Sequence, residues 1–131
     1  RPEATAETLI DGWLHTGDVA VVDDEGFISI QDRIKDMIIS GGENVYPAEI
    51  EAVLMSHPDI TEAAVIGRES ARWGESPFAI VVRSDTSLTE YQVADFCREK
   101  LAGYKQPQGV AFIEEIPRNP SGKILKRVLS T

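Results

Sequence analysis

The sequence lacks three features, and each absence excludes a class of protein. Its single cysteine, Cys97, cannot form a disulfide within the chain. No apolar run approaches the roughly 20 residues of a membrane-spanning helix, and residues 1–8 lack the hydrophobic stretch of a signal peptide. Lys and Arg total 13 against 22 Asp and Glu. A nucleic-acid partner is not expected, because binding a phosphate backbone requires a basic face.

The composition that is present is typical of one globular domain. Apolar residues make up 42% and charged residues 27% of the 131 positions, which is enough to form a core. An unpaired cysteine fits the reducing cytoplasm, where we expect the protein to be located. Cys97 follows Phe96 in a helical pattern, so we interpret it as a buried packing residue, and we interpret Trp13 and Trp73 as packing residues too. The absence of an initiator Met predicts that the chain begins inside a longer polypeptide.

Basic residues gather at the end of this acidic chain. The segment after Pro117 contains Arg118, Lys123, Lys126 and Arg127 and no acid. Two interpretations stay open. A solvated basic end is the ordinary outcome for such a run, and a site for a small polyanion is the alternative.

Hydrophobic periodicity predicts a β-hairpin followed by a small α+β domain. In chain order we expect strands over 19–22 and 27–30 joined by a four-residue turn, an apolar run over 37–39, a helix from Pro47 to the His57-Pro58 stop, interior strands over 63–67 and 78–82 separated by a loop over 68–77, a helix from the Thr89 N-cap to Gly103, and a strand over 110–113. This order predicts a small mixed β-sheet with helices packed on it in two layers.

Four short motifs occur in a recognisable order. They are GWLHTGD at 12–18, DRIKDMIISGGENVYPAEIE at 32–51, YKQP at 104–107 and PRNPSGK at 117–123. Together they resemble the late motifs of the adenylate-forming superfamily, which includes acyl-CoA synthetases, the adenylation domains of peptide synthetases and luciferases. The resemblance covers nearly the whole chain and is greatest to fatty acid or aryl acid CoA ligases.

This resemblance implies that the chain is the C-terminal portion of an ATP-dependent acyl-CoA ligase. Residues 1–31 would then be the final β-hairpin of a large N-terminal domain, 32–36 a hinge, and 37–131 the mobile C-terminal domain. In that family a carboxylic acid attacks the α-phosphorus of ATP, pyrophosphate leaves, and a thiol then displaces AMP. The implied substrates and cofactor are a carboxylic acid, ATP, coenzyme A and Mg²⁺, and fatty acid metabolism is the implied context.

The same resemblance predicts what the segment does not contain. The sequence has no Gly/Ser/Thr-rich phosphate loop and no obvious metal-ligand cluster, so the ligands of Mg²⁺ are expected outside this chain. We therefore expect the segment alone to be inactive. The acid pocket is also expected in the large domain, which is the implied partner of this segment.

Two residues are implied to bind the nucleotide. Asp18 matches the ribose-binding aspartate of the family, and a carboxylate offers two acceptor oxygens to neighbouring hydroxyl groups. Arg33 matches an arginine at the nucleotide, where a planar guanidinium holds oxygens with two bonds at once. The alternative for Arg33 is a surface salt bridge to Asp32 or Asp36.

Three further residues are implied to serve the movement of the small domain or the second half-reaction. Lys35 matches the hinge about which the small domain turns, a role that needs backbone freedom rather than acid-base chemistry. Gly41 and Gly42 match glycines that approach the pantetheine arm of CoA, where a missing Cβ lets a thin ligand pass. The alternatives are a solvated lysine and ordinary turn glycines. Ile39 stands where some relatives have a second lysine, so a mechanism needing that lysine is not expected.

Lys123 is implied to be the catalytic residue. The preceding Gly122 is flexible, so the ammonium can reach the carboxylate of the acid and the α-phosphate as charge develops there. Its expected role is confined to adenylation. The alternative is a tail lysine in a basic cluster.

Two rival functions remain open from the sequence. One is an adenylation domain that loads a carrier protein, although the motifs over 40–51 and 104–107 favour stand-alone ligases. The other is a non-catalytic binding module, which joint retention of Asp18, Arg33 and Lys123 disfavours. Self-association of the segment through the face expected to meet the large domain also stays open.

Overall fold

The computed structural model describes residues 1–130. The chain divides between Lys35 and Asp36 into two compact units. Within the described part of the chain, no helix combines the length and the apolar character that crossing a bilayer requires.

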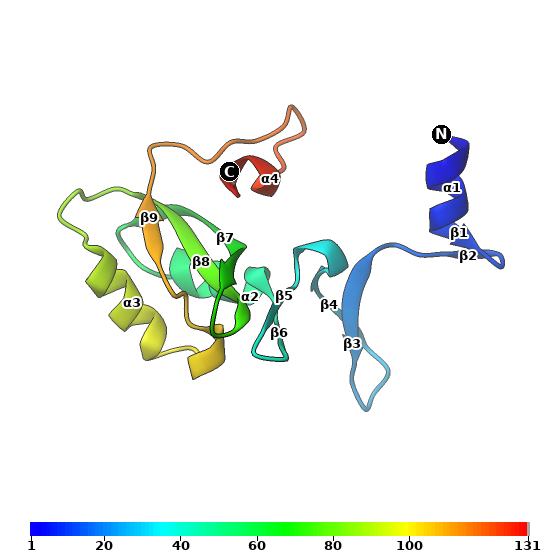
Figure 1. Cartoon of the computed structure of the whole chain (residues 1–131), viewed down its shortest axis with the longest axis horizontal. Helices are drawn as coiled ribbons and strands as arrows, with labels where there is room; N and C mark the ends of the chain where they lie inside the picture. Colours follow the sequence, from blue (N-terminus) through cyan, green and yellow to red (C-terminus); the bar gives the residue numbers. More distant parts are fainter. Residues whose placement is uncertain (131) are drawn as a thin grey trace. The chain divides into compact units, whose positions relative to one another are not determined.

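The first unit is built from short elements around one β-hairpin (Figure 1). Its elements are α1 (Pro2–Thr8), β1 (Leu9–Ile10), β2 (Trp13–Leu14), β3 (Asp18–Val22) and β4 (Ile28–Arg33), followed by the 3₁₀ turn η1 (Ile34–Asp36). The β3–β4 hairpin confirms the prediction over 19–30. Its turn is closed by the Asp23 carboxylate, which accepts hydrogen bonds from the backbone N–H groups of Glu25 and Phe27. The sequence did not predict α1, β1 or β2.

Strand β4 is longer than the sequence predicted. It continues through Asp32 and Arg33, which were assigned to the hinge, because these residues pair in register with Val19 and Asp18. Both are polar, so apolar periodicity could not reveal their strand conformation. The break in regular structure falls instead at η1.

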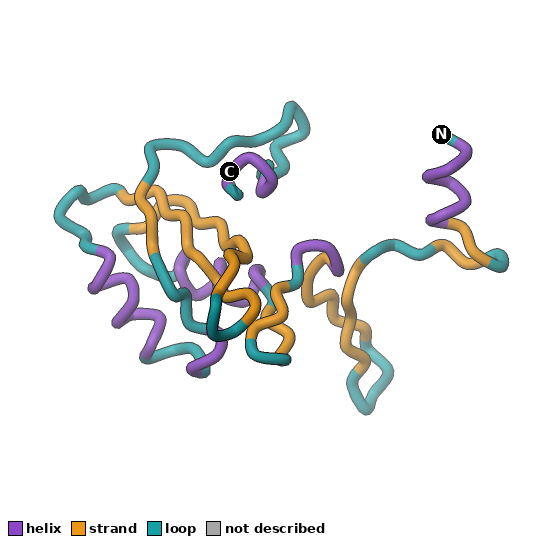
Figure 2. Tube along the Cα trace, in the orientation of Figure 1, coloured by secondary structure: helices purple, strands orange, loops and turns teal. Residues whose placement is uncertain are grey.

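The second unit is a two-layer α+β domain around a five-stranded sheet (Figure 2). Its elements are β5 (Ile38–Ser40), β6 (Glu43–Val45), α2 (Pro47–Met55), β7 (Ile60–Ser70), β8 (Gly74–Arg83), α3 (Glu90–Arg98), the 3₁₀ turn η2 (Gly103–Lys105), β9 (Val110–Phe112) and α4 (Lys126–Leu129). The strand order is β6-β5-β8-β7, and β9 pairs in parallel with β8 while the other pairs are antiparallel. The predicted small mixed sheet with packed helices is confirmed.

The β7–β8 hairpin differs from its prediction in two ways. The segment over 68–77 was expected to be a loop, but it forms strand ends joined by a turn at Ala71–Trp73. Strand β8 is interior as predicted, whereas β7 pairs only with β8 among the described strands and is an edge. Four consecutive β7 residues, 63–66, are nevertheless buried, because α2 and α4 pack against this strand. Because both faces of β7 are buried, its sequence is continuously apolar like that of an interior strand, although β7 is an edge strand.

Both predicted long helices are present and contribute to one core, but α3 ends at Arg98 rather than at the predicted Gly103. In α2, Pro47 occupies the first turn and Ile50 and Leu54 are fully buried. Helix α3 begins at the predicted N-cap Thr89, whose side chain accepts from the Gln92 N–H in a capping box. The core cluster is completed by buried residues of the strands, the helices and the segments that flank α3: Ile38, Val45, Ile60, Ala63, Val65, Ala79, Val81, Leu88, Val93, Cys97, Leu101 and Val110.

The location of Cys97 generates a prediction about its reactivity. Its side chain is buried, and burial raises the pKa of the thiol to about 11. Since the thiolate is the reactive form, we expect no labelling of the folded chain by a disulfide reagent at pH 8, and complete labelling after unfolding in guanidinium. Absorbance at the wavelength of the released thiolate measures both. Rapid stoichiometric labelling without denaturant would contradict the buried position.

Candidate functional site

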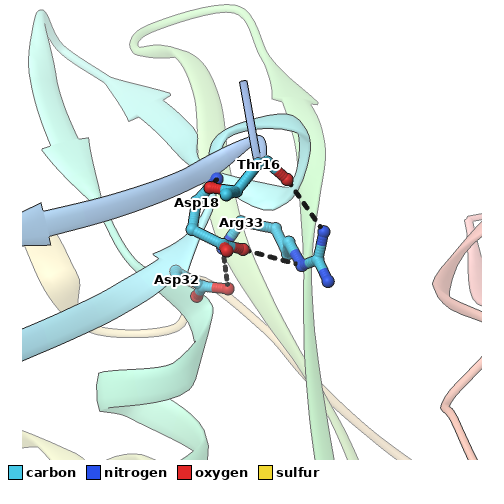
Figure 3. Close-up of polar contacts among 4 residues, drawn as sticks. All are labelled: Thr16, Asp18, Asp32 and Arg33. Atoms are coloured by element: carbon cyan, nitrogen blue, oxygen red, sulfur yellow. Dashed lines mark hydrogen bonds and ion pairs between the residues drawn. The ribbon is translucent and has the colours of Figure 1, made fainter. Parts of the chain in front are cut away.

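The first group of candidate residues lies where β3 begins and β4 ends. Asp18 and Arg33 face each other in the ladder, and Arg33 Nε lies 2.9 Å from Asp18 Oδ1 (Figure 3). Arg33 Nη1 also donates to the backbone oxygen of Thr16 at 3.3 Å. Gly17, at a φ of 75°, turns the chain into β3, and its carbonyl accepts from the Ile34 N–H. The structure therefore brings together the two residues predicted to bind nucleotide.

This pairing changes the alternative interpretation of Arg33. Its guanidinium forms an ion pair with Asp18, while the Asp32 carboxylate accepts from the backbone N–H of Arg33 at 2.8 Å. The Arg33 side chain is 50% exposed, so the pair contributes at most about 1 kcal/mol to stability. A carboxylate acceptor and a guanidinium donor held side by side can bind a vicinal diol or an anionic oxygen.

Lys35 is the last residue of the first unit. It lies in η1 and is exposed. Lys35 lies where the chain passes from one unit to the next, the position that a pivot requires. Its ammonium forms no ion pair within residues 1–130.

Gly41 and Gly42 form the turn between β5 and β6. Both have positive φ, 59° and 87°, a conformation that glycine adopts without the Cβ clash of other residues. The Gly41 N–H donates to the Trp73 carbonyl at 2.9 Å, and a Cβ at Gly41 would lie 2.9 Å from the indole ring. Gly41 is therefore required for close packing as well as for the turn, whereas a Cβ at Gly42 would meet nothing within 4 Å.

A pocket of about 280 Å³ opens beside Gly41. It is lined by residues of the β5–β6 turn, the β7–β8 turn and the η2 segment: Ser40, Gly41, Glu43, Trp73, Gly103, Tyr104 and Gln108. Trp73 and Tyr104 are 41% and 44% exposed. The interpretation of Trp73 as a packing residue is therefore incomplete, and Trp13, which is 77% exposed, does not pack within residues 1–130. Sequence periodicity missed Trp73 because it lies in a turn.

Lys123 lies on a separate loop and does not line this pocket. The Asn119 carboxamide oxygen accepts from the backbone N–H groups of Ser121 and Lys123 at 3.0 and 2.9 Å, and from the Ser121 hydroxyl. Gly122, at a φ of 85°, allows the tight return. Lys123 itself is exposed, and within residues 1–130 its ammonium has no ion-pair partner.

Other lysines of the motifs are already paired with acids of α2. Lys105 Nζ lies 2.9 Å from both carboxylate oxygens of Glu49, and this hydrogen bond is the main reason that the pKa of Lys105 is raised. Lys126 Nζ lies 2.8 Å from Glu51 Oε1. The basic tail is thus only partly available to a polyanion.

No group of three or more His, Cys, Asp or Glu side chains suited to a metal ion occurs among the described residues.

Two curated relatives match almost the whole chain. A 2-succinylbenzoate–CoA ligase from Bacillus cytotoxicus is 55% identical over 98% of this chain. The long-chain-fatty-acid–CoA ligase FadD13 from Mycobacterium tuberculosis is likewise 55% identical over 98%. The aligned region is 27% and 26% of these proteins, so the chain spans about a quarter of their length.

A solved enzyme shares the fold over the same region. The o-succinylbenzoate CoA synthetase MenE from Bacillus subtilis, in complex with the acyl-adenylate intermediate OSB-AMP, matches with a TM-score of 0.94 and 44% identity, covering 100% of this chain and 27% of that one. The same enzyme with ATP and a magnesium ion matches with a TM-score of 0.89 and 43% identity, over 97% and 26% of the two chains.

A family model adds the identification. The model described as the AMP-binding enzyme C-terminal domain matches residues 49–123, which is more than half of the chain and includes both Glu51 and Lys123. With relatives that are 55% identical along nearly the full sequence, the chain belongs to the family of AMP-binding enzyme C-terminal domains.

Proposed function

We propose that this chain is the C-terminal part of an ATP-dependent acyl-CoA ligase, which activates a carboxylic acid as acyl-AMP and then transfers the acyl group to coenzyme A. The observation that carries the proposal is the exposed Lys123, which has no ion-pair partner within residues 1–130 and lies on a loop ordered by Asn119, in a chain that is 55% identical to two named CoA ligases. Both relatives are named for CoA, which favours free CoA over a carrier-bound thiol.

Lys123 acts in adenylation. Its ammonium stabilises the charge that develops between the attacking carboxylate and the α-phosphate of ATP. Because the loop is already ordered by five hydrogen bonds around Asn119, little ordering is needed when the lysine meets substrate. Mg²⁺ would add positive charge at the phosphates, with its ligands in the remainder of the enzyme.

Asp18 and Arg33 bind the nucleotide. The Asp18 carboxylate accepts from ribose hydroxyls, and the Arg33 guanidinium, oriented by Asp18 and the Thr16 carbonyl, donates to ribose or phosphate oxygens. The existing ion pair supports this assignment, because it fixes the donor beside the acceptor before the nucleotide arrives.

Gly41 and Gly42 border the path of the pantetheine arm of CoA. The pocket beside Gly41, with the exposed faces of Trp73 and Tyr104, supports a thin, partly apolar ligand there. Lys35 then serves as the hinge between an adenylating pose and a thioester-forming pose. The division of the chain after Lys35 supports a pivot at η1, with the β3–β4 hairpin up to Arg33 belonging to the large domain and residues 37–131 to the mobile one.

The identity of the acid is not determined by this segment. A 2-succinylbenzoate ligase and a long-chain fatty acid ligase match it equally well, at 55% identity. A domain that serves such different acids does not form the pocket that selects between them. The large domain selects the acid, and the isolated segment has no activity.

Replacement of Lys123 separates the two half-reactions. In the full-length enzyme, we expect Lys123→Ala to reduce acid-dependent ATP–pyrophosphate exchange by about a hundredfold, the effect of losing one placed charge-stabilising donor. Thioester formation from a supplied acyl adenylate and CoA should persist. Exchange that survives this replacement would remove Lys123 from the mechanism and favour a non-catalytic module.

Replacement of Gly41 should impair thioester formation and spare adenylation, the reverse of the effect expected for Lys123→Ala. A Cβ at this position meets the Trp73 ring at 2.9 Å and strains a φ of 59°, so Gly41→Ala should displace the pocket wall. We expect thioester formation to fall by about tenfold or more, while pyrophosphate exchange changes by less than about twofold. Equal loss in both assays would show general disruption of the domain instead.

A further inference from the structure

The loop that carries Lys123 is closed at its base by backbone contacts. Arg118 and Ile124 form an antiparallel bridge, and the Leu125 N–H donates to the Pro117 carbonyl at 2.9 Å. Helix α4 begins at the next residue, Lys126. Any contact that fixes Lys126 therefore fixes the base of this loop, only three residues from Lys123.

Lys126 is held by an ion pair that is largely shielded from solvent. Its Nζ lies 2.8 Å from Glu51 Oε1, and the two side chains are 20% and 21% exposed. The same oxygen accepts from the backbone N–H of Val65 at 2.9 Å. Glu51 thus joins three elements, since it lies on α2, accepts from β7 and binds the first residue of α4.

The contact on the other side of the loop is weaker. Arg118 lies 3.4 Å from Glu62 with the side chains 43% and 37% exposed, so this pair is longer and more screened than the Lys126 pair. Arg118 also donates to the Gly122 carbonyl at 2.9 Å, which orders the loop internally without attaching it to the sheet. Glu51 and Lys126 therefore provide the main polar attachment of the loop to the domain.

Helix α4 packs against β7 but has no buried residue of its own. It contains four residues. An element this short has no intrinsic stability as a helix, so its position depends on tertiary contacts. Loss of the ion pair would release the base of the loop while the core of the domain stayed intact.

We propose that Lys126, through its ion pair with Glu51, is a positioning residue for Lys123 in the adenylation step. This inference rests on the proposed function. Lys126 contacts neither the acid nor ATP; it fixes where the loop leaves the sheet and thereby where the Lys123 ammonium is presented. A displacement of about 1 Å at a reacting group can cost up to a hundredfold in rate, so loss of this contact should affect adenylation and spare thioester formation.

The test compares Lys126→Met with Lys123→Ala in the full-length enzyme. We expect Lys126→Met to lower kcat for ATP–pyrophosphate exchange by about tenfold, with KM for ATP changed by less than about twofold. Thioester formation from supplied acyl adenylate should be unchanged, and Lys126→Arg should restore exchange because it keeps the charge. Glu51→Gln keeps an acceptor for the Val65 N–H, and should reproduce the loss seen with Lys126→Met.

Two controls distinguish positioning from other roles. Lys100→Met removes the same charge from an exposed lysine that lies over the Phe96 ring at 4.1 Å, and should leave both half-reactions unchanged. The double variant Lys123→Ala with Lys126→Met should exchange no more slowly than Lys123→Ala alone, because Lys126 acts only through Lys123.

Three results would overturn the inference. One is full exchange activity in Lys126→Met, and another is a parallel loss of both half-reactions with a lowered melting temperature, which indicates a purely structural role. The third is a double variant about tenfold slower than Lys123→Ala, which gives Lys126 an independent role. If Lys123→Ala itself leaves exchange intact, the proposed function fails instead, and the two failures are thereby separated.

Discussion

The antiparallel pairing of β7 with β8 supports every other strand of the second unit. The ladder runs from Ile60 opposite Arg83 to Ser70 opposite Gly74. Strand β5 joins β8 at the turn end of this ladder, and β9 joins β8 in parallel near its middle. Helices α2 and α4 pack against β7. The candidate sites of the second unit therefore take their positions from one long hairpin: the turn end holds the pocket and the β7 side holds the base of the Lys123 loop.

The overall composition does not reveal which basic residues of the second unit are paired with acids. The chain has a formal net charge of −9, yet the proposed chemistry requires free positive charge. Helix α2 contributes Glu49 and Glu51, which pair with Lys105 and Lys126. Those lysines become structural, because an ammonium held by a carboxylate is less available to a phosphate. Lys123, between the anchored ends of its loop, is exposed to solvent and forms no ion pair with any residue that the structure describes.

Local sequence patterns predicted the helices and strands better than the contacts between distant segments. The capping box at Thr89, the helix at Pro47 and the β3–β4 hairpin follow from rules that act over a few residues. The polar outer part of the β7–β8 hairpin lacks apolar alternation, so it looked like a loop. Motif resemblance selected Asp18, Arg33 and Lys123, but it could not reveal which acids hold the basic residues, since those contacts join segments distant in the sequence.

The first unit exposes an apolar surface that it cannot bury by itself. Within residues 1–35 no side chain is fully buried, and the hairpin exposes Val22, Phe27, Ile28 and Ile30 by more than 60% each. A unit of this size cannot form a sufficient core alone, so its apolar surface requires a further partner. The large domain of a ligase would supply that partner and would hold the Asp18–Arg33 pair firmly. The hairpin would then belong to the fixed part of the enzyme, and Lys123 to the part that moves.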